Sequence, residues 1–187
     1  DGYRISHDSL GETNFVTLSF ARNYGMWLEA VGQYSEAESF YRRSVAGFDN
    51  LSVAADRFVL NGWRAVADAV GEQGRYDEAE SIARAVFEAA KTTFGKDDGT
   101  TLSLEHDVAA LLTEEGRSSE AEALFREVAD ADQKAGANRD YLRTLSNLAM
   151  CIRDQGREKE AYDLAQKVYA KQEQLFGNED SETLVSD

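Results

Sequence analysis

Apolar residues along this chain recur three and four positions apart, and the strict alternation of apolar and polar residues that marks a strand is missing. This spacing is the period of amphipathic helices. The chain contains no proline, so tight turns and helix ends must be formed by glycine, asparagine, aspartate and serine. We therefore expect an all-α protein.

A seven-residue phrase occurs four times in nearly the same form. Its copies begin at Gly32, Gly74, Gly116 and Gly156 and read GQYSEAE, GRYDEAE, GRSSEAE and GREKEAY. Fifteen residues before each glycine stands a second recurring pair: Thr17-Leu18, Val59-Leu60, Thr101-Leu102 and Tyr141-Leu142. A period of about 42 residues with two helical stretches is typical of an α-solenoid, in which each repeat buries its apolar face against the next.

Each repeat is predicted to contain two helices that meet at the glycine, which ends the first helix in a left-handed conformation. Ser35, Asp77 and Ser118 are expected to cap the second helices. The alanines five residues after each glycine should lie where the paired helices approach most closely: Ala37, Ala79, Ala121 and Ala161. We expect a single array over residues 1–187, with repeats at about 14–50, 56–92, 98–136 and 138–176 and the start of a truncated fifth repeat at 177–187.

These features resemble the tetratricopeptide repeat (TPR) of the kinesin-light-chain type, which is also found in nucleotide-binding signalling proteins. The residues that carry the resemblance are the Thr-Leu pairs, Asn147-Leu148-Ala149 and the glycine phrase, and they span almost the whole chain. Where such proteins usually have His-Pro before Thr-Leu, this chain has Asn14-Phe15, Asp98-Gly99 and Asp180-Ser181. The resemblance implies a right-handed α-solenoid of antiparallel helix pairs whose first helices line a concave surface.

The charge of the chain narrows the classes of partner. Thirty-five acidic and twenty basic residues give a formal net charge of −15, which disfavours nucleic acid and anionic membranes as partners. The single Cys151 cannot form an internal disulfide, and the chain has neither a secretory leader nor an apolar run near the length of a membrane span. We expect a cytoplasmic protein.

The sequence offers no catalytic motif. It contains no phosphate-binding GxxxxGK[ST] loop, no HExxH and no GxSxG, so we expect neither catalysis nor a cofactor. Asp98, Gly99 and Glu105 fit three places of a calcium loop, but Phe94 and Lys96 stand where oxygen ligands are needed, and we expect no metal. Cys151 is interpreted as a small buried filler.

The resemblance places a candidate peptide-binding face on the first helices. Its residues recur at helical spacing beyond each Thr-Leu position: Arg22, Asn23, Met26, Arg64, Asp68, His106, Asn147 and Met150. The arginines would meet acidic groups of an extended peptide, and Asn23 and Asn147 would hydrogen-bond its backbone. Alternatively, the arginines pair with acids such as Glu29 or Asp68 and only keep the surface soluble. The carboxylate clamp of chaperone-binding TPR domains is missing.

We thus expect a non-catalytic protein–protein interaction module that is part of a longer protein. Its ligand is expected to be a protein or a peptide, and acidic ligands are among the candidates. Two alternatives stay open. One is the sensor arm of a multidomain signalling ATPase, and the other is a structural spacer or self-association scaffold that associates through exposed terminal repeats. Trp27 and Phe48 either pack between repeats or lie exposed on a contact surface.

Overall fold

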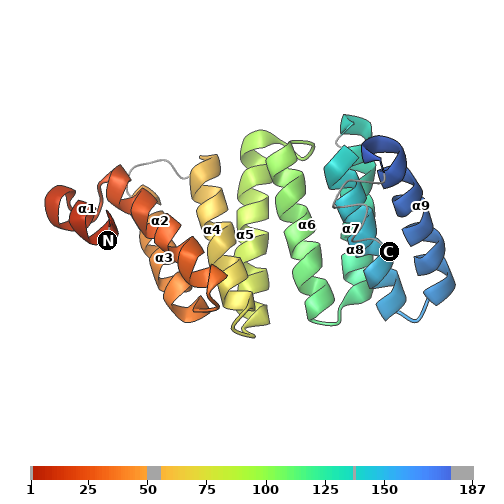
Figure 1. Ribbon diagram of the computed structural model, residues 1–187, viewed down its shortest axis with the longest axis horizontal. Helices are drawn as coiled ribbons and strands as arrows, with labels where there is room; N and C mark the ends of the chain where they lie inside the picture. The colour runs from red at the N-terminus through yellow and green to blue at the C-terminus, as the bar shows by residue number, and fades with distance from the viewer. Residues whose placement is uncertain (1, 50–55, 137, 178–187) are drawn as a thin grey trace. The chain divides into compact units, whose positions relative to one another are not determined.

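The computed structural model describes residues 2–49, 56–136 and 138–177, and every regular element in these ranges is an α-helix (Figure 1). The chain divides into two compact units, an N-terminal unit, Asp1–Leu104, and a C-terminal unit, Glu105–Asp187. The N-terminal unit contains α1 (Gly2–Leu10), α2 (Phe15–Ala30), α3 (Tyr34–Asp49), α4 (Arg57–Gly71) and α5 (Tyr76–Phe94). Helix α6 (Gly99–Glu114) crosses the division, and the C-terminal unit continues with α7 (Ser118–Ala135), α8 (Asn138–Asp154) and α9 (Glu158–Phe176).

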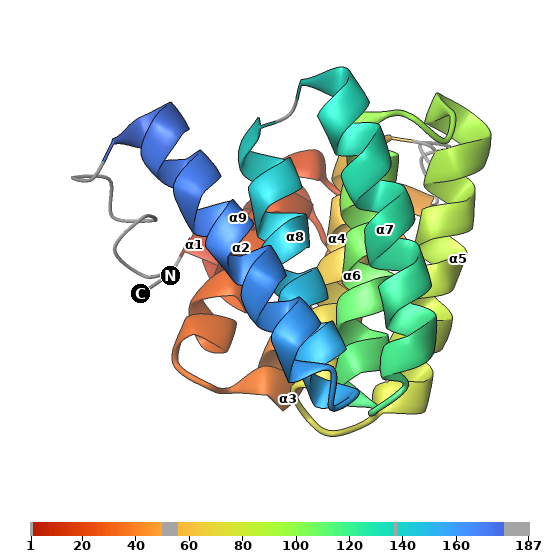
Figure 2. The same cartoon turned by 90° about the vertical axis from the view of Figure 1, so that its right-hand side faces the viewer.

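Helices that are neighbours in sequence pack against each other within each unit. In the N-terminal unit α1 contacts α2, α2 contacts α3, α3 contacts α4 and α4 contacts α5. In the C-terminal unit α8 lies between α7 and α9, as Figure 2 shows. The second residue of each Thr-Leu position is buried: Leu18, Leu60, Leu102 and Leu142. The sequence spacing therefore identified the buried face of the first helices.

The turn between paired helices has the same geometry in all four repeats. Gly32, Gly74, Gly116 and Gly156 have φ between 76° and 77°. The backbone N–H of the residue after each glycine donates to a carbonyl five residues earlier, as from Gln33 to Leu28 at 2.8 Å and from Arg157 to Ile152 at 3.2 Å. This is the Schellman arrangement, which only a residue tolerant of positive φ completes without strain. The expectation that glycine ends each first helix is confirmed.

The predicted caps of the second helices are wrong. Helices α5, α7 and α9 have Arg75, Arg117 and Arg157 at their N-caps, and none of the three forms a side-chain cap hydrogen bond. The helix resumes two residues after the glycine, so Asp77 and Ser118 already lie inside it. Side-chain caps occur instead on first helices: the N–H of Val16 donates to Asn14 at 2.9 Å and the N–H of Phe58 donates to Asp56 at 2.7 Å.

The recurring phrase also encodes an ion-pair network between successive repeats. In the N-terminal unit Arg75 donates to Glu38 at 2.6 Å and to Glu78 at 2.5 Å, and Arg42 bridges the same two carboxylates. The C-terminal unit repeats this arrangement with Arg157, Arg126, Glu122 and Glu160. An arginine that follows a turn glycine thus joins its own second helix to the preceding second helix.

Small residues allow paired helices to approach closely. The alanine that follows the phrase's first Glu is buried as predicted, with Ala37, Ala79 and Ala121 at 0% exposure. A Cβ on Gly25 of α2 would lie 2.8 Å from the ring of Tyr41 on α3. Gly25 stands where repeat four has Ala149, so its missing side chain makes room for a buried tyrosine.

Helix α1 was not predicted, because it carries neither a Thr-Leu position nor a turn phrase. It packs against α2 as α3 packs against α4, so it takes the place of a second helix. Its end at Leu10-Gly11 has φ 88° at the glycine, close to the 91° of Gly95 after α5. The side chain of Phe48 and residues 178–187, on which the sequence raised expectations, lie outside what the structure describes.

Candidate functional site

Arg22 of α2 is held by an aromatic ring from the next first helix. Its guanidinium carbon lies 4.7 Å above the centre of the Phe58 ring on α4, and Phe58 in turn contacts Phe15 with ring centroids 6.1 Å apart. Within residues 2–49, 56–136 and 138–177 the guanidinium has no hydrogen-bond acceptor or ion-pair partner. Cation–π stacking fixes the plane of the group without occupying its N–H donors.

The corresponding residues of the next two repeats also reach forward to the next first helix. Nη1 of Arg64 on α4 lies 3.4 Å from Oγ of Ser103 on α6, and Arg64 is half-buried. Nε2 of His106 on α6 lies 3.0 Å from the amide nitrogen of Asn147 on α8. In the first three repeats the residue four positions beyond the Thr-Leu leucine therefore bridges two first helices, and Arg22 does so through the Phe58 ring. In the fourth repeat the hydroxyl of Ser146 instead donates to the Leu142 carbonyl of its own helix at 3.0 Å.

Glu29, an acidic residue on the same helix as Arg22, is engaged by a buried tyrosine. The hydroxyl of Tyr41 donates to Oε2 of Glu29 at 2.5 Å, and Tyr41 is fully buried. Burial, this hydrogen bond and the charges of Glu29 and Asp68 raise the pKa of Tyr41 above its usual value, so the ring stays neutral. Glu29 is thus the acceptor for Tyr41, and the alternative in which it pairs with Arg22 is not what the geometry shows.

The other predicted residues of the N-terminal unit are accessible. Asn23 is exposed, Met26 is 52% exposed and Asp68 is half-buried. Arg22, Asn23 and Met26 share α2, while Arg64 and Asp68 lie on the adjacent α4. We call these five residues the first-helix face of the N-terminal unit.

The predicted residues of the C-terminal unit divide into a buried pair and an exposed methionine. His106 is only 5% exposed, its ring meets Phe125 edge to face at 5.3 Å, and Nδ1 lies 3.6 Å from the Asp107 carboxylate. Asn147 is half-buried beside it, whereas Met150 is 51% exposed. His106 and Asn147 therefore stabilise the packing of α6 against α8 in addition to any contact with a ligand.

Sequence reasoning missed the aromatic partner of Arg22. Phe58 stands one residue before Val59-Leu60 and faces back towards α2, so a count along one helix face does not reach it. Only pairing each first helix with the next would have brought Phe15, Arg22 and Phe58 together.

The remaining candidates have structural roles. Both carboxylate oxygens of Asp98 accept from Arg57, at 3.0 and 2.7 Å, and Oδ1 also accepts the N–H of Thr100. In the part of the chain that the structure describes, no three His, Cys, Asp or Glu side chains gather as a metal site would require. Cys151 is fully buried, its thiol donates to the Ser118 carbonyl at 2.9 Å, and burial raises the pKa of the thiol.

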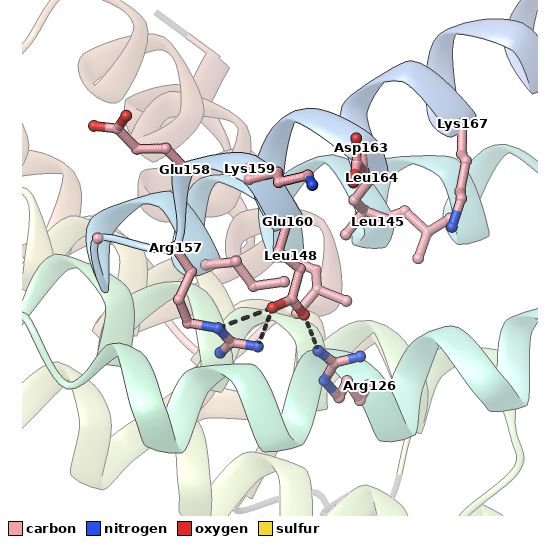
Figure 3. A pocket seen from close by; sticks show the side chains of 12 residues that line it. Arg126, Leu145, Leu148, Arg157, Glu158, Lys159, Glu160, Asp163, Leu164 and Lys167 are labelled. Carbon is pink, nitrogen blue, oxygen red and sulfur yellow. Dashed lines mark hydrogen bonds and ion pairs between the residues drawn. The ribbon is translucent and has the colours of Figure 1, made fainter.

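A pocket of about 700 Å³ lies in the C-terminal unit among α7, α8 and α9 (Figure 3). Its apolar lining comes from Leu145, Leu148, Ile152 and Leu164. Two arginines on its wall, Arg126 and Arg157, both bind Glu160, as the dashed lines show. The pocket thus opens over the ion-pair network that the repeated phrase creates, and it shares no residue with the predicted peptide-binding set.

Comparisons with known proteins agree with this architecture. Two family models, each described as a tetratricopeptide repeat, match residues 58–134 and 142–182, together more than half of the chain. No curated protein sequence matches significantly.

Solved structures with the same fold are distant in sequence. Kinesin-light-chain TPR-like repeats from P. anserina align over 92% of this chain and 82% of theirs, with 21% identity and a TM-score of 0.79. BtubC from P. vanneervenii aligns over 96% of this chain and 74% of its own, with 13% identity and a TM-score of 0.81. The Rap conjugation regulator of plasmid pLS20, solved with the Phr* peptide, aligns over 98% and 53%, with 17% identity and a TM-score of 0.66. The predicted fold class, a TPR solenoid of antiparallel helix pairs, is confirmed. No described helix is both long and apolar enough to cross a bilayer.

Proposed function

Because the chain belongs to the tetratricopeptide repeat family, we propose that it is a non-catalytic protein–protein interaction module whose first helices bind an extended peptide in a concave groove. The repeats at about 14–50, 56–92, 98–136 and 138–176 would act as one array. A similar fold in the Rap conjugation regulator was solved with the Phr* peptide, which supports this mode of binding.

The observation that carries the proposal is the state of Arg22. Other arginines of the described chain, such as Arg42, Arg75, Arg126 and Arg157, form ion pairs with carboxylates of this protein. Arg22 instead lies over Phe58 with its N–H donors available, and Phe58 reduces the rotational freedom that binding would otherwise remove. A planar fork of donors held in this way suits a carboxylate, which it can bind through two hydrogen bonds.

The neighbours of Arg22 supply the other contacts that an extended peptide needs. The Asn23 amide can donate to and accept from a peptide backbone, and Met26 presents a flexible apolar side chain. Arg64 and Asp68 continue the first-helix face on α4. We therefore propose a peptide with a carboxylate at Arg22 and an apolar side chain at Met26.

Titration with a set of matched peptides tests the proposal. Capped extended peptides with one to three Asp or Glu residues, their Asn and Gln counterparts and scrambled versions are titrated against the wild type, Arg22→Ala and Arg22→Lys by fluorescence anisotropy. We expect Arg22→Ala to weaken acidic peptides roughly tenfold, and Arg22→Lys to recover only part of this because lysine is a point charge without the planar fork.

Arg84→Ala is the matched control, since Arg84 on α5 is exposed and paired with Glu80 outside the first-helix face. It should bind as the wild type does. Equal affinity of the wild type and Arg22→Ala for every acidic peptide that binds would refute the proposed site.

A further inference from the structure

Glu29 lies on the same side of α2 as Arg22, two helical turns further along. Seven residues make almost two full turns at about 3.6 residues per turn, and Met26 lies between the two charges. At about 1.5 Å per residue, the positions are about 10 Å apart along the helix. Trp27, which is 55% exposed, lies on another side of α2 and takes no part. We call Arg22, Met26 and Glu29 the α2 charge stripe.

The positions of Arg22 and Met26 stay accessible in a repeat that has a neighbouring first helix before and after it. Their equivalents in the next repeat are Arg64 and Asp68 on α4, a helix that meets both α2 and α6 through side chains. Arg64 and Asp68 are nevertheless only half-buried. The accessibility of Arg22 and Met26 is therefore a property of their place in the repeat.

Glu29 is held in position by the protein without a basic partner. Its Oε2 accepts the hydroxyl of Tyr41 at 2.5 Å, and Tyr41 is fully buried, so the carboxylate is fixed. Within residues 2–49, 56–136 and 138–177 no lysine, arginine or histidine side chain pairs with it. The glutamates of the N-terminal unit that do form ion pairs lie on second helices: Glu38, Glu78, Glu80 and Glu88.

The electrostatic potential at the end of α2 is negative for more than one reason. Glu29 stands in the last turn of the helix, where free backbone carbonyls carry partial negative charge. Glu72, directly after α4, lies close by. The charge of Glu72, partial burial, a hydrogen bond to Glu72 and the charge of Glu29 together raise the pKa of Tyr34 above its usual value. A cation would therefore be stabilised at Glu29.

An extended peptide matches the separation of the two charges of the stripe. In a polyproline II conformation three residues span about 9 Å, and side chains three residues apart point in the same direction. A carboxylate at Arg22 and a basic side chain at Glu29 would thus stand three residues apart in the peptide. The residues between them would lie over Met26, which is 52% exposed.

We propose that the α2 charge stripe selects peptides in which an acidic and a basic residue stand three positions apart, the carboxylate at Arg22 and the ammonium or guanidinium group at Glu29. This inference rests on the proposed function, because it uses the same arginine, and it adds a cation to the ligand. The order of the two charges in the peptide then sets the direction in which the peptide lies along α2.

The probes are capped, labelled peptides of equal composition with one aspartate and one lysine. The two residues stand three apart in both orders, adjacent, or seven apart. Equal composition is needed because the net charge of −15 attracts any lysine. Peptides with glutamine for lysine and with asparagine for aspartate complete the set. By fluorescence anisotropy we expect one order of the three-apart pair to bind roughly fivefold more tightly than the adjacent and seven-apart pairs.

Two variants separate the two charges of the stripe. Glu29→Gln keeps an oxygen that accepts from Tyr41, and it should remove the preference for lysine over glutamine while aspartate stays preferred over asparagine. Arg22→Ala should have the opposite effect. Glu36→Gln is the matched control, because it removes the same charge from an exposed position on α3 of the same unit. Thermal unfolding checks that each variant folds.

The possible failures are distinguishable. If the wild type binds lysine and glutamine peptides equally while Arg22 still selects aspartate, this inference is wrong and the proposed function stands. A lysine preference that persists in folded Glu29→Gln also overturns the inference. Affinities that do not depend on Arg22 for any peptide would refute the proposed function and the inference together.

Discussion

At the scale of single residues, Gly25 decides whether Tyr41 can lie buried between α2 and α3. The position corresponds to the alanine of Asn147-Leu148-Ala149, and here even one methyl group would stand 2.8 Å from two ring carbons of Tyr41. The ring cannot simply turn away, because its hydroxyl donates to Glu29 and the side chain is fully buried. Glycine and tyrosine thus form a complementary pair.

Gly25→Ala should lower the free energy of unfolding by ~1–3 kcal/mol, because overpacking outweighs the better helix propensity of alanine. Gly99→Ala is the matched control, since Gly99 lies in a helix and a methyl group added there would meet nothing within 4 Å. We expect that variant to be neutral or slightly stabilised. Urea unfolding of both compares them directly, and equal stability would show that the α2–α3 contact adapts freely.

At the scale of helices and turns, the arginines of the repeated phrase control how successive second helices pack. Burial raises the pKa of Glu122, but hydrogen bonds from Arg126, Gln155 and Arg157 outweigh it and lower the pKa from 4.5 to about 2. The same contacts from Gln73, Arg42 and Arg75 outweigh burial at Glu38 and lower its pKa. The network therefore stabilises the protein only while these glutamates are ionised.

This lowered pKa predicts a defined pH dependence. The stabilisation from Glu122 is complete above about pH 4.5, where the unfolded chain is also ionised, and is lost as the pH falls towards 2. Glu122→Gln should unfold more easily at pH 7 and show a shallower loss of stability between these values. Glu127→Gln, on the exposed side of the same helix, is the control. Parallel acid unfolding curves for the wild type and Glu122→Gln would contradict the assignment.

The sequence predicted the helices well because their signals are local. Apolar spacing and the turn glycines determine where a first helix is buried and where it ends, and Leu18 and Gly32 lie as expected. The predicted caps at Asp77 and Ser118 were wrong because the second helix already begins two residues after the Schellman glycine, with an arginine at the N-cap. Helix α1 was missed because it lacks both recurring marks.

The candidate site was harder to predict, because its properties depend on contacts between helices. The sequence put Arg22 and His106 at equivalent positions, yet one lies over Phe58 with accessible donors and the other is buried against Phe125. The difference comes from aromatic residues on neighbouring helices, which the period of a single helix does not reveal.

At the scale of the whole molecule, the net charge of −15 opposes the approach of the acidic peptides that Arg22 would bind. Added salt screens this repulsion, since the Debye length falls from about 30 Å at 0.01 M to about 10 Å at 0.1 M. The association rate constant for an acidic peptide should therefore rise with salt, while that of its Asn and Gln counterpart stays constant. Stopped-flow fluorescence measures both, and a rate that falls with salt would show that local positive charge dominates the encounter.

The repeated phrase has a consequence for how such a protein lengthens during evolution. In the copies that begin at Gly74 and Gly156, the glycine reverses the chain direction, and the arginine after it pairs with a glutamate of the preceding copy, Glu38 or Glu122. A duplicated repeat whose phrase contains both the arginine and the glutamate, as GRYDEAE does, carries both partners of this ion pair. Ligand-binding residues on the first helices can then change while the contacts between successive second helices stay the same.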